Sequence, residues 1–316
     1  MLAARYTAPG CVELVRTSDA TCARDGLLLR PEVVGICGSD LHFCHDSSPD
    51  QYPLPPGFSG HECVAIVEEG SAYPCGTRVL ALAPDYDAFA EGLAATQDSV
   101  IPVPEGLAAE RAVLAQQLGT VIYCSRKLPN VLDRNVVIIG QGPAGLLFTM
   151  LLSRMGARTI VGIDLEAHRL RLAAALGATC TVCASQEDTV EVVREHTQGT
   201  MADLVVEAVG KAETLDLCSV LVRPHGHIAL FGMPKAQVLP VDVEAFLRMN
   251  VRITTSVFAQ REPGLHSFRL ALEMVASGRL DPWPLVSHQL PFASIARGFV
   301  LAETRTESAV KVLLHL

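Results

Sequence analysis

The sequence predicts an α/β protein in which an irregular, mostly β part is followed by a doubly wound parallel sheet. Three observations predict this class. Residues 1 to about 110 are rich in glycine, proline and short β-branched runs, which are typical of strands and turns. From about Val131, short apolar strands alternate with helical segments. The length of 316 residues suits two domains better than one core.

The first part contains three segments that we predict as strands, separated by turns such as Pro55-Pro56-Gly57. They are Leu27–Val34, Cys63–Glu68 and Arg78–Leu82. No long helical period occurs in this part, so we expect an irregular β domain.

The second part alternates strand and helix without interruption. The predicted strands are Val136–Ile139, Thr159–Ile163, Thr181–Cys183, Leu204–Glu207 and His227–Phe231. The predicted helices are Ala144–Met155, Glu166–Ala175, Glu187–His196 and Ala212–Leu221. Continuously apolar strands are typical of a parallel sheet covered on both faces, and right-handed crossovers make that sheet doubly wound.

The C-terminal tail is predicted to hold one helix, Pro263–Ser277, then a proline-rich turn and a closing strand, Ala309–Leu314. We expect this tail to rejoin the first domain.

Composition and charge exclude several classes of protein. Hydrophobic residues make up 49% and charged residues 19%, which is a globular composition. The net charge of −9 argues against nucleic acid or an anionic membrane as a partner. No apolar run has the roughly 18 residues of a membrane helix, and no signal peptide is visible. We therefore expect a cytoplasmic protein whose ten cysteines are thiols or metal ligands.

A glycine-rich turn marks a dinucleotide site. Strand Val136–Ile139 runs directly into Gly140-Gln-Gly-Pro-Ala-Gly145, which opens a helix. The first glycine permits the tight turn, the second lets a phosphate approach the backbone, and the third allows close packing of helix on sheet. The helix N-terminus then offers free N–H groups to the pyrophosphate. The candidate cofactor-binding residues here are Gly140, Gly142, Pro143, Ala144 and Gly145.

The next strand supports the same interpretation. Asp164 ends it, 19 residues after Gly145. A carboxylate there accepts hydrogen bonds from the adenosine ribose and repels a 2′-phosphate, so NAD is favoured over NADP. The alternative is an ordinary helix N-cap before Glu166. Arg169, one helical turn further, is a candidate to cover the adenine or ribose; the alternative is a solvated surface arginine.

Two short segments concentrate metal-binding side chains. Gly35–His42 contains Cys37, and Gly57–Glu62 ends in His61 and Glu62. Thiolate, imidazole and carboxylate are all zinc ligands, and a catalytic zinc needs three of them and one open position. Taken singly, each residue is more often a buried thiol or a hydrogen-bonded polar side chain. Cys180 and Cys183, three apart on a strand, face opposite sides and are predicted to be core residues.

At this point the residues resemble the zinc-dependent medium-chain dehydrogenase/reductase family, and most of all its polyol branch of sorbitol and threonine dehydrogenases. The segments that carry the resemblance cover nearly the whole chain in the family's order. They are G-I-C-G-S-D-L-H (35–42), G-H-E (60–62), G-Q-G-P-A-G (140–145), the Asp164 position and A-V-K-V-L-L (309–314).

The resemblance implies a GroES-like catalytic domain (1–118), a Rossmann NAD-binding domain (119–257) and a return to the catalytic domain (258–316). It implies a homodimer or homotetramer, for which strand Val251–Ser256 is a candidate pairing edge. It assigns a catalytic zinc to Cys37 and His61, with Glu62 as a further ligand. It assigns proton transfer to Ser39 and His42, and orientation of a ligand to Asp40. On the nicotinamide side it assigns Thr120, Phe231, Gly232 and Met233.

The sequence departs from the family in two places. The four-cysteine lobe of a structural zinc is absent, because Leu82–Ala90 leads directly to the next strand, so we expect no structural zinc. The family's further metal-site residue, usually Glu or Cys, falls on Gln116, a weak neutral donor. Gln116 is therefore expected either to touch bound water or to mark a weakened or absent metal.

The resulting hypothesis is an oxidoreductase that transfers a hydride between a polar secondary alcohol and NAD, with the substrate oxygen polarised by one zinc ion. Ser39 takes the hydroxyl proton and passes it through the cofactor ribose to His42. Two alternatives remain open. One is a metal-free reductase of an enone or quinone, and the other is an NAD-binding protein without catalysis.

Overall fold

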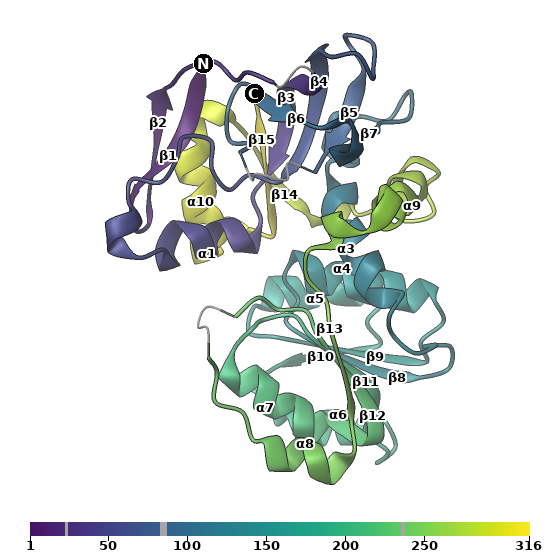
Figure 1. Ribbon diagram of the computed structural model, residues 1–316. Helices are drawn as coiled ribbons and strands as arrows, with labels where there is room; N and C mark the ends of the chain where they lie inside the picture. The colour runs from purple at the N-terminus through teal and green to yellow at the C-terminus, as the bar shows by residue number, and fades with distance from the viewer. Residues whose placement is uncertain (23–24, 83–86, 235–237) are drawn as a thin grey trace. The chain divides into compact units, whose positions relative to one another are not determined.

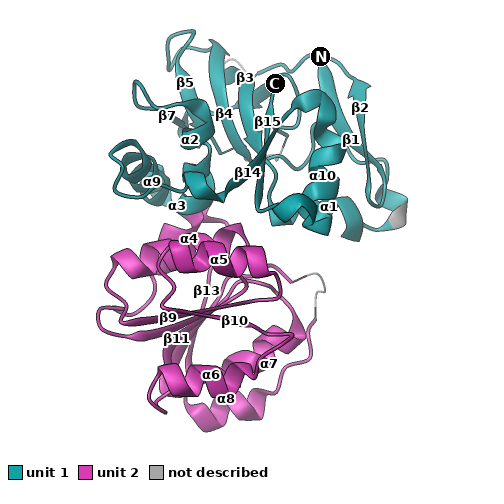
Figure 2. Ribbon diagram, turned by 180° about the vertical axis from the view of Figure 1, so that it is seen from behind, with its two compact units in different colours: residues 1–119, 260–316 teal, residues 120–259 magenta. Residues whose placement is uncertain are grey.

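The computed structural model describes residues 1–22, 25–82, 87–234 and 238–316 (Figure 1). The chain forms two compact units (Figure 2). Unit 1 comprises Met1–Gly119 and Gln260–Leu316, and unit 2 comprises Thr120–Ala259. Each unit has its own sheet and apolar core, and the predicted α/β class is confirmed.

A seven-stranded sheet organises unit 1, in the order β14-β15-β3-β4-β5-β7 with β6 beside β3. The pair β14–β15 is parallel, and the other pairs are antiparallel. The strands are β3 (Leu27–Gly35), β4 (Glu62–Glu69), β5 (Arg78–Ala81), β6 (Leu93–Ala95), β7 (Val100–Pro102), β14 (Val286–Pro291) and β15 (Lys311–His315). A separate hairpin joins β1 (Leu2–Ala8) and β2 (Cys11–Arg16). The C-terminal strand thus lies beside β3, in the middle of this sheet.

The described part of unit 1 contains four α-helices that the sequence analysis did not predict. They are α1 (Gly38–Asp46), α2 (Ala109–Ala112), α10 (Ile295–Thr304) and α3 (Leu114–Ser125), which runs into unit 2. α1 and α2 are short, so an apolar period could not mark them. The predicted C-terminal helix is α9 (His266–Ala276).

The helix predicted over Pro263–Ser277 is shorter than expected. It begins at His266, because Gly264 (φ 71°) and Leu265 (φ 52°) both take left-handed backbone conformations that interrupt the helix.

Unit 2 is a six-stranded parallel sheet in the order β10-β9-β8-β11-β12-β13. The strands are β8 (Asn135–Ile139), β9 (Thr159–Asp164), β10 (Cys180–Cys183), β11 (Ala202–Glu207), β12 (Val222–Leu230) and β13 (Arg252–Thr255). The helices are α4 (Pro143–Arg154), α5 (Ala167–Ala175), α6 (Thr189–His196), α7 (Ala212–Leu221) and α8 (Val243–Met249). Figure 1 shows α4 and α5 on one face of the sheet and α6, α7 and α8 on the other. This is the doubly wound arrangement that the alternating pattern predicts.

Three details of unit 2 differ from the prediction. Helix α8 was not predicted. β12 begins five residues earlier than expected, because the polar stretch Arg223–His225 hid its start from an apolar pattern. Cys180 and Cys183 are half-buried and not core residues, because β10 lies at the edge of the sheet. No helix in the described part of the chain is long and apolar enough to cross a membrane.

Candidate functional site

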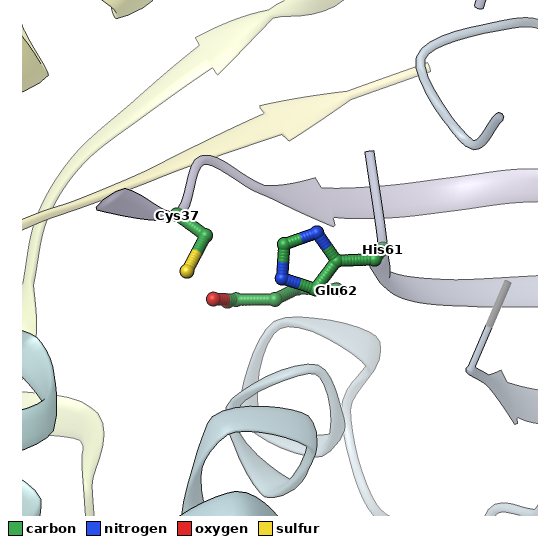
Figure 3. Close-up of side chains that lie close together, drawn as sticks. All are labelled: Cys37, His61 and Glu62. Carbon is green, nitrogen blue, oxygen red and sulfur yellow. The ribbon is translucent and has the colours of Figure 1, made fainter. Parts of the chain in front are cut away.

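Cys37, His61 and Glu62 converge in unit 1 (Figure 3). Cys37 caps the N-terminus of α1, two residues after β3 ends, and Glu62 is the first residue of β4. Because β3 and β4 pair with Gly35 opposite Glu62, the two segments end at the same edge of the sheet. The potential ligand atoms of the three residues lie within 4.8 Å of one another. The fold therefore brings together three side chains that can hold one metal ion.

Gly35 makes room for the carboxylate. A Cβ atom at this position would lie 2.5 Å from Oε2 of Glu62. Only glycine leaves the space into which the Glu62 side chain is packed.

The buried carboxylate of Asp40 ties the two segments together. Its Oδ2 accepts a hydrogen bond from the Cys37 backbone N–H at 2.7 Å, and its Oδ1 accepts one from Ser59 Oγ at 2.9 Å. Oδ1 also lies 3.4 Å from Nδ1 of His61. Tyr6 extends the network, with its hydroxyl 2.6 Å from Ser59 Oγ. Asp40 thus holds the backbone of one candidate ligand and lies against the ring of another.

The ring of His61 is oriented by its Nδ1. This atom lies 3.1 Å from the carbonyl of Ser59. A carbonyl can only accept, so Nδ1 carries a proton, and Nε2 becomes a ligand once a metal ion displaces its proton. Burial acts to lower the pKa of His61, but the charge of Asp40 and hydrogen bonds to Asp40 and Cys37 outweigh it. They hold this pKa well above its ordinary value.

Glu62 pairs with a buried lysine, Lys311, which the sequence analysis did not predict as a site residue. Lys311 Nζ lies 2.8 Å from both Oε1 and Oε2 of Glu62 and donates to the carbonyl of Ile36 at 3.2 Å. Both side chains are buried, at 1% and 0% exposed. Burial acts to lower the pKa of Lys311, but the charges of Glu62 and Cys37 outweigh it and raise this pKa. The available signal was a single lysine in the apolar run Ala309–Leu314.

Of the two adjacent glutamines, the one that sequence reasoning passed over contacts a candidate ligand. Gln117 Nε2 lies 4.0 Å from Cys37 Sγ. Both Gln116 and Gln117 are buried residues of α3. Consecutive helical residues point in different directions, and the motif alone does not show which of the two glutamines faces Cys37.

The two candidate proton-transfer residues lie on the helix that Cys37 caps. Ser39 and His42 are half-buried residues of α1. His42 Nδ1 lies 2.6 Å from Oδ2 of Asp46, one turn further along. A carboxylate accepts the Nδ1 proton, so Nε2 of His42 is the nitrogen that can receive another.

In unit 2 the glycine-rich turn between β8 and α4 has two positions that require glycine. Gly140 has φ 89°, a left-handed conformation that favours glycine. A Cβ on Gly145 would lie 1.8 Å from the carbonyl oxygen of Gly140, so this position also requires glycine. A Cβ on Gly142 would meet only Arg169 Nη1, at 3.7 Å. The backbone of Gly142, the N-cap of α4, is thus open to a ligand, and Pro143 and Ala144 begin the helix.

Asp164 braces this turn from the end of β9. Its Oδ2 accepts from the backbone N–H of Gln141 at 2.6 Å, and its Oδ1 accepts from Leu165 and Glu166 at 2.7 and 2.9 Å. Arg169 is a buried residue of α5 near Gly142. The N-cap of α5 is Glu166, so Asp164 holds the residues that precede the helix.

The remaining candidates follow β12 or lie in α3. The backbone N–H groups of Phe231 and Gly232 both donate to the backbone carbonyl of Glu207 at 2.9 Å. The Phe231 ring packs edge-on against Phe148, with ring centroids 5.0 Å apart. Met233 is 50% exposed. Thr120 is a half-buried residue of α3. The segment Leu82–Ala90, expected to replace a structural-zinc lobe, falls partly on residues 83–86, outside the described residues.

Comparison with known proteins gives consistent results. Residues 143–277 match the family model described as zinc-binding dehydrogenase. The chain is 28% identical to sorbitol dehydrogenase of Bacillus subtilis, over 92% of this chain and 90% of that protein. It is 24% identical to L-threonine 3-dehydrogenase of the same organism, over 91% of this chain and 90% of that protein. The solved structure of an alcohol dehydrogenase from Thermus sp. ATN1 superposes with a TM-score of 0.89 at 29% identity, covering 100% of both chains.

Proposed function

Because the chain belongs to the zinc-dependent medium-chain dehydrogenase/reductase family, we propose that it transfers a hydride between a polar secondary alcohol and NAD. Polyols, sugars and cyclitols are the substrate class. The observation that carries the proposal is the convergence of Cys37, His61 and Glu62 within 4.8 Å, in a chain that also has the glycine-rich turn. In this proposal the predicted catalytic domain (1–118 with 258–316) holds the metal and the predicted Rossmann domain (119–257) holds NAD.

The donor set fits a zinc ion. Zinc accepts thiolate, imidazole and carboxylate ligands at about 2.0–2.3 Å, so that ligand atoms around one ion lie about 3.5 Å apart. Three such atoms within 4.8 Å of one another need only a small closure to share one ion. Cys37 and His61 would hold the metal, with Glu62 beside it and Gln116 or Gln117 facing bound water. A zinc ion there supplies Lewis acidity to the substrate oxygen.

NAD fits the turn at Gly142. In this proposal the helix N-terminus offers N–H groups to the pyrophosphate, and Asp164, at the end of β9, accepts from the adenosine ribose. Arg169, Thr120, Phe231, Gly232 and Met233 keep their predicted roles around the cofactor. NAD supplies the hydride acceptor.

The proton leaves through α1 in this proposal. Ser39 accepts the hydroxyl proton of the substrate, and His42 Nε2 receives it on the way to solvent. Asp46 keeps the Nδ1 proton of His42 in place, so that only Nε2 can act as the acceptor.

Replacing His42 by glutamine is expected to slow turnover mainly at low pH, where release of a proton to solvent is hardest, by about 10- to 100-fold. The measurement is a pH profile of kcat/KM for alcohol oxidation. Asp46→Asn should shift the profile in the same direction by a smaller amount, because it removes the group that orients the ring. A profile identical to that of the wild type in His42→Gln would remove His42 from the relay.

The test of the overall proposal is metal analysis of the purified protein followed by a screen of NAD reduction over polar alcohols, repeated with NADP. We expect about one zinc per chain, activity on at least one polyol or related secondary alcohol, and a preference for NAD. A zinc-loaded protein that binds NAD but oxidises none of the alcohols would be a cofactor-binding protein without catalysis.

The neutral side chains of Gln116 and Gln117 favour one other candidate. With no charged ligand in that segment, a metal-free reductase of an enone or quinone is the alternative. A purified, active protein that contains no zinc and prefers NADPH would support this alternative.

We also propose that the protein is a cytoplasmic homodimer or homotetramer. All ten cysteines are free, as in a reducing compartment. β13 lies at the edge of the unit 2 sheet, where Val243, Leu247 and Ile253 expose large apolar side chains. Light scattering that gives the mass of a single chain would exclude the oligomer.

A further inference from the structure

Ser59, in the loop before His61, has a backbone conformation that serine rarely adopts. Its φ is 97°, in the left-handed region that favours glycine, and its side chain is fully buried. A glycine would take this conformation without strain, as Gly57 does two residues earlier with φ 84°. The backbone alone therefore does not account for a serine at this position, and its hydroxyl calls for an explanation.

Both polar groups of Ser59 contact the surroundings of a candidate metal ligand. Its carbonyl lies 3.1 Å from Nδ1 of His61, and its hydroxyl donates to Oδ1 of Asp40 at 2.9 Å. Oδ1 of Asp40 lies in turn 3.4 Å from the same Nδ1. One residue thus contacts the ring of His61 and also holds the carboxylate beside that ring.

Tyr6 of β1 holds the hydroxyl of Ser59 from the other side. The two hydroxyl oxygens lie 2.6 Å apart, and because the proton of Ser59 goes to Asp40, Tyr6 is the donor between them. Burial and the charge of Asp40 raise the pKa of Tyr6, so its hydroxyl keeps its proton. The Tyr6 ring is buried and packs edge-on against Phe299 of α10, with centroids 5.6 Å apart. A well-packed ring therefore fixes the direction in which the serine hydroxyl points.

The carboxylate of Asp40 depends on this hydroxyl for its tie to the second ligand segment. Its Oδ2 accepts from the backbone N–H of Cys37 at 2.7 Å. Without Ser59 Oγ, Oδ1 keeps the longer 3.4 Å contact with His61. Asp40 is fully buried, so water does not readily replace the lost donor. The carboxylate is then less firmly held, and so is the imidazole ring beside it.

We propose that Ser59 and Tyr6 are positioning residues that hold Asp40 and the His61 ring in the orientation that binds the metal. This inference rests on the proposed metal site and names two hydroxyl groups that tune it. The family resemblance assigns orientation of a ligand to Asp40, but it assigns no role to either hydroxyl. Neither hydroxyl touches the metal or the substrate in this proposal.

The first test is the zinc affinity of Ser59→Ala, measured by competition with a chelator. Alanine carries the same backbone strain as serine at this φ, so the change isolates the hydroxyl. We expect zinc to bind at least about tenfold more weakly than to the wild type, the scale on which partners of metal ligands act. The visible spectrum of the cobalt-substituted protein should also change, because the imidazole ring is reoriented. Wild-type affinity and spectrum in folded Ser59→Ala would overturn the proposal.

Ser59→Gly separates the hydroxyl from the backbone and keeps the test decisive if Ser59→Ala does not fold. Glycine adopts a φ of 97° without strain. If the hydroxyl positions Asp40, Ser59→Gly should lose zinc affinity by about the same tenfold factor as Ser59→Ala. If Ser59 acts only through the shape of the loop, Ser59→Gly should bind zinc as tightly as the wild type, and the proposal is wrong.

Tyr6→Phe tests whether the phenol acts through Ser59. The ring stays, and the serine can still donate to Asp40, so we expect a loss of zinc affinity of about threefold, near the lower end of what one hydrogen bond contributes. In the Ser59→Ala background, Tyr6→Phe should have no further effect beyond about twofold. Wild-type affinity in Tyr6→Phe, or an equal loss in both backgrounds, would remove Tyr6 from the proposal.

The matched control is Tyr52→Phe. The hydroxyl of Tyr52 donates to the carbonyl of Cys44 in α1 at 2.8 Å, so the same chemical change is made in the same unit without touching Asp40. It should leave the zinc affinity and the cobalt spectrum unchanged. A wild type that binds no zinc would overturn the metal site itself, whereas a zinc-binding wild type matched by Ser59→Ala would overturn this inference alone.

Discussion

Replacing Cys37 by alanine is expected to abolish zinc binding and turnover while NAD still binds. Cys37 provides a thiolate, whereas the carboxylate of Glu62 is held by Lys311. Without the thiolate, His61 is left with a carboxylate that Lys311 already holds, and we do not expect these two groups to retain zinc against a chelator. We expect zinc affinity to fall at least about 100-fold and turnover at least about 1000-fold, since Lewis-acid stabilisation supplies several kcal/mol.

The measurements are metal content after chelation, turnover of the best alcohol substrate, and calorimetry of NAD binding. Cys44→Ala is the control, because Cys44 is another thiol of the same unit, buried in α1. It should retain both zinc and activity. Full activity in Cys37→Ala would end the proposed mechanism.

Replacing Gly142 by alanine is expected to weaken NAD binding at least about tenfold with little loss of stability. Among the described residues, the added Cβ meets only Arg169 Nη1, at 3.7 Å. The backbone at Gly142 is extended, with φ −67° and ψ −177°, which alanine adopts without strain. The cost to the fold should be about 1 kcal/mol or less, from the poorer N-cap. A bound pyrophosphate, however, needs the space that the methyl group would fill.

Gly145→Ala provides the contrast, because its Cβ would lie 1.8 Å from the carbonyl oxygen of Gly140. It should destabilise unit 2 by about 1–3 kcal/mol or more and lose NAD binding through that damage. Thermal unfolding and NAD titration of both variants separate the two effects. If Gly142→Ala binds NAD as the wild type does, the cofactor does not contact this turn.

Local sequence patterns predicted the architecture of unit 2 well. Strands β8, β9 and β11 lie close to their predicted bounds, and so do the helices between them. Strand and helix periods depend on consecutive residues, so the sequence shows them directly. Gly140 and Gly145 were likewise predictable, since the need for glycine arises within the turn itself. Unit 1 was less predictable, because its strands are irregular and α1 is a short helix whose buried residues are Asp40 and Cys44, not an apolar series.

The candidate ligands Cys37, His61 and Glu62 were recognisable from the sequence as types of side chain in short motifs, and so were Ser39, Asp40 and His42. Their mutual geometry was not. The contact of Gln117 with Cys37 and the bonds of Ser59 with Asp40 and Tyr6 depend on how strands and helices pack.

The sequence by itself determined the parallel sheet, the nucleotide turn and the chemical types that gather at the metal site. Only the tertiary structure decided that Lys311 neutralises Glu62 across 249 residues of chain. The physical reason is that β15 takes its place beside β3 through backbone pairing between distant segments. The sequence pattern around Lys311 or around Glu62 does not predict that these two residues will pair.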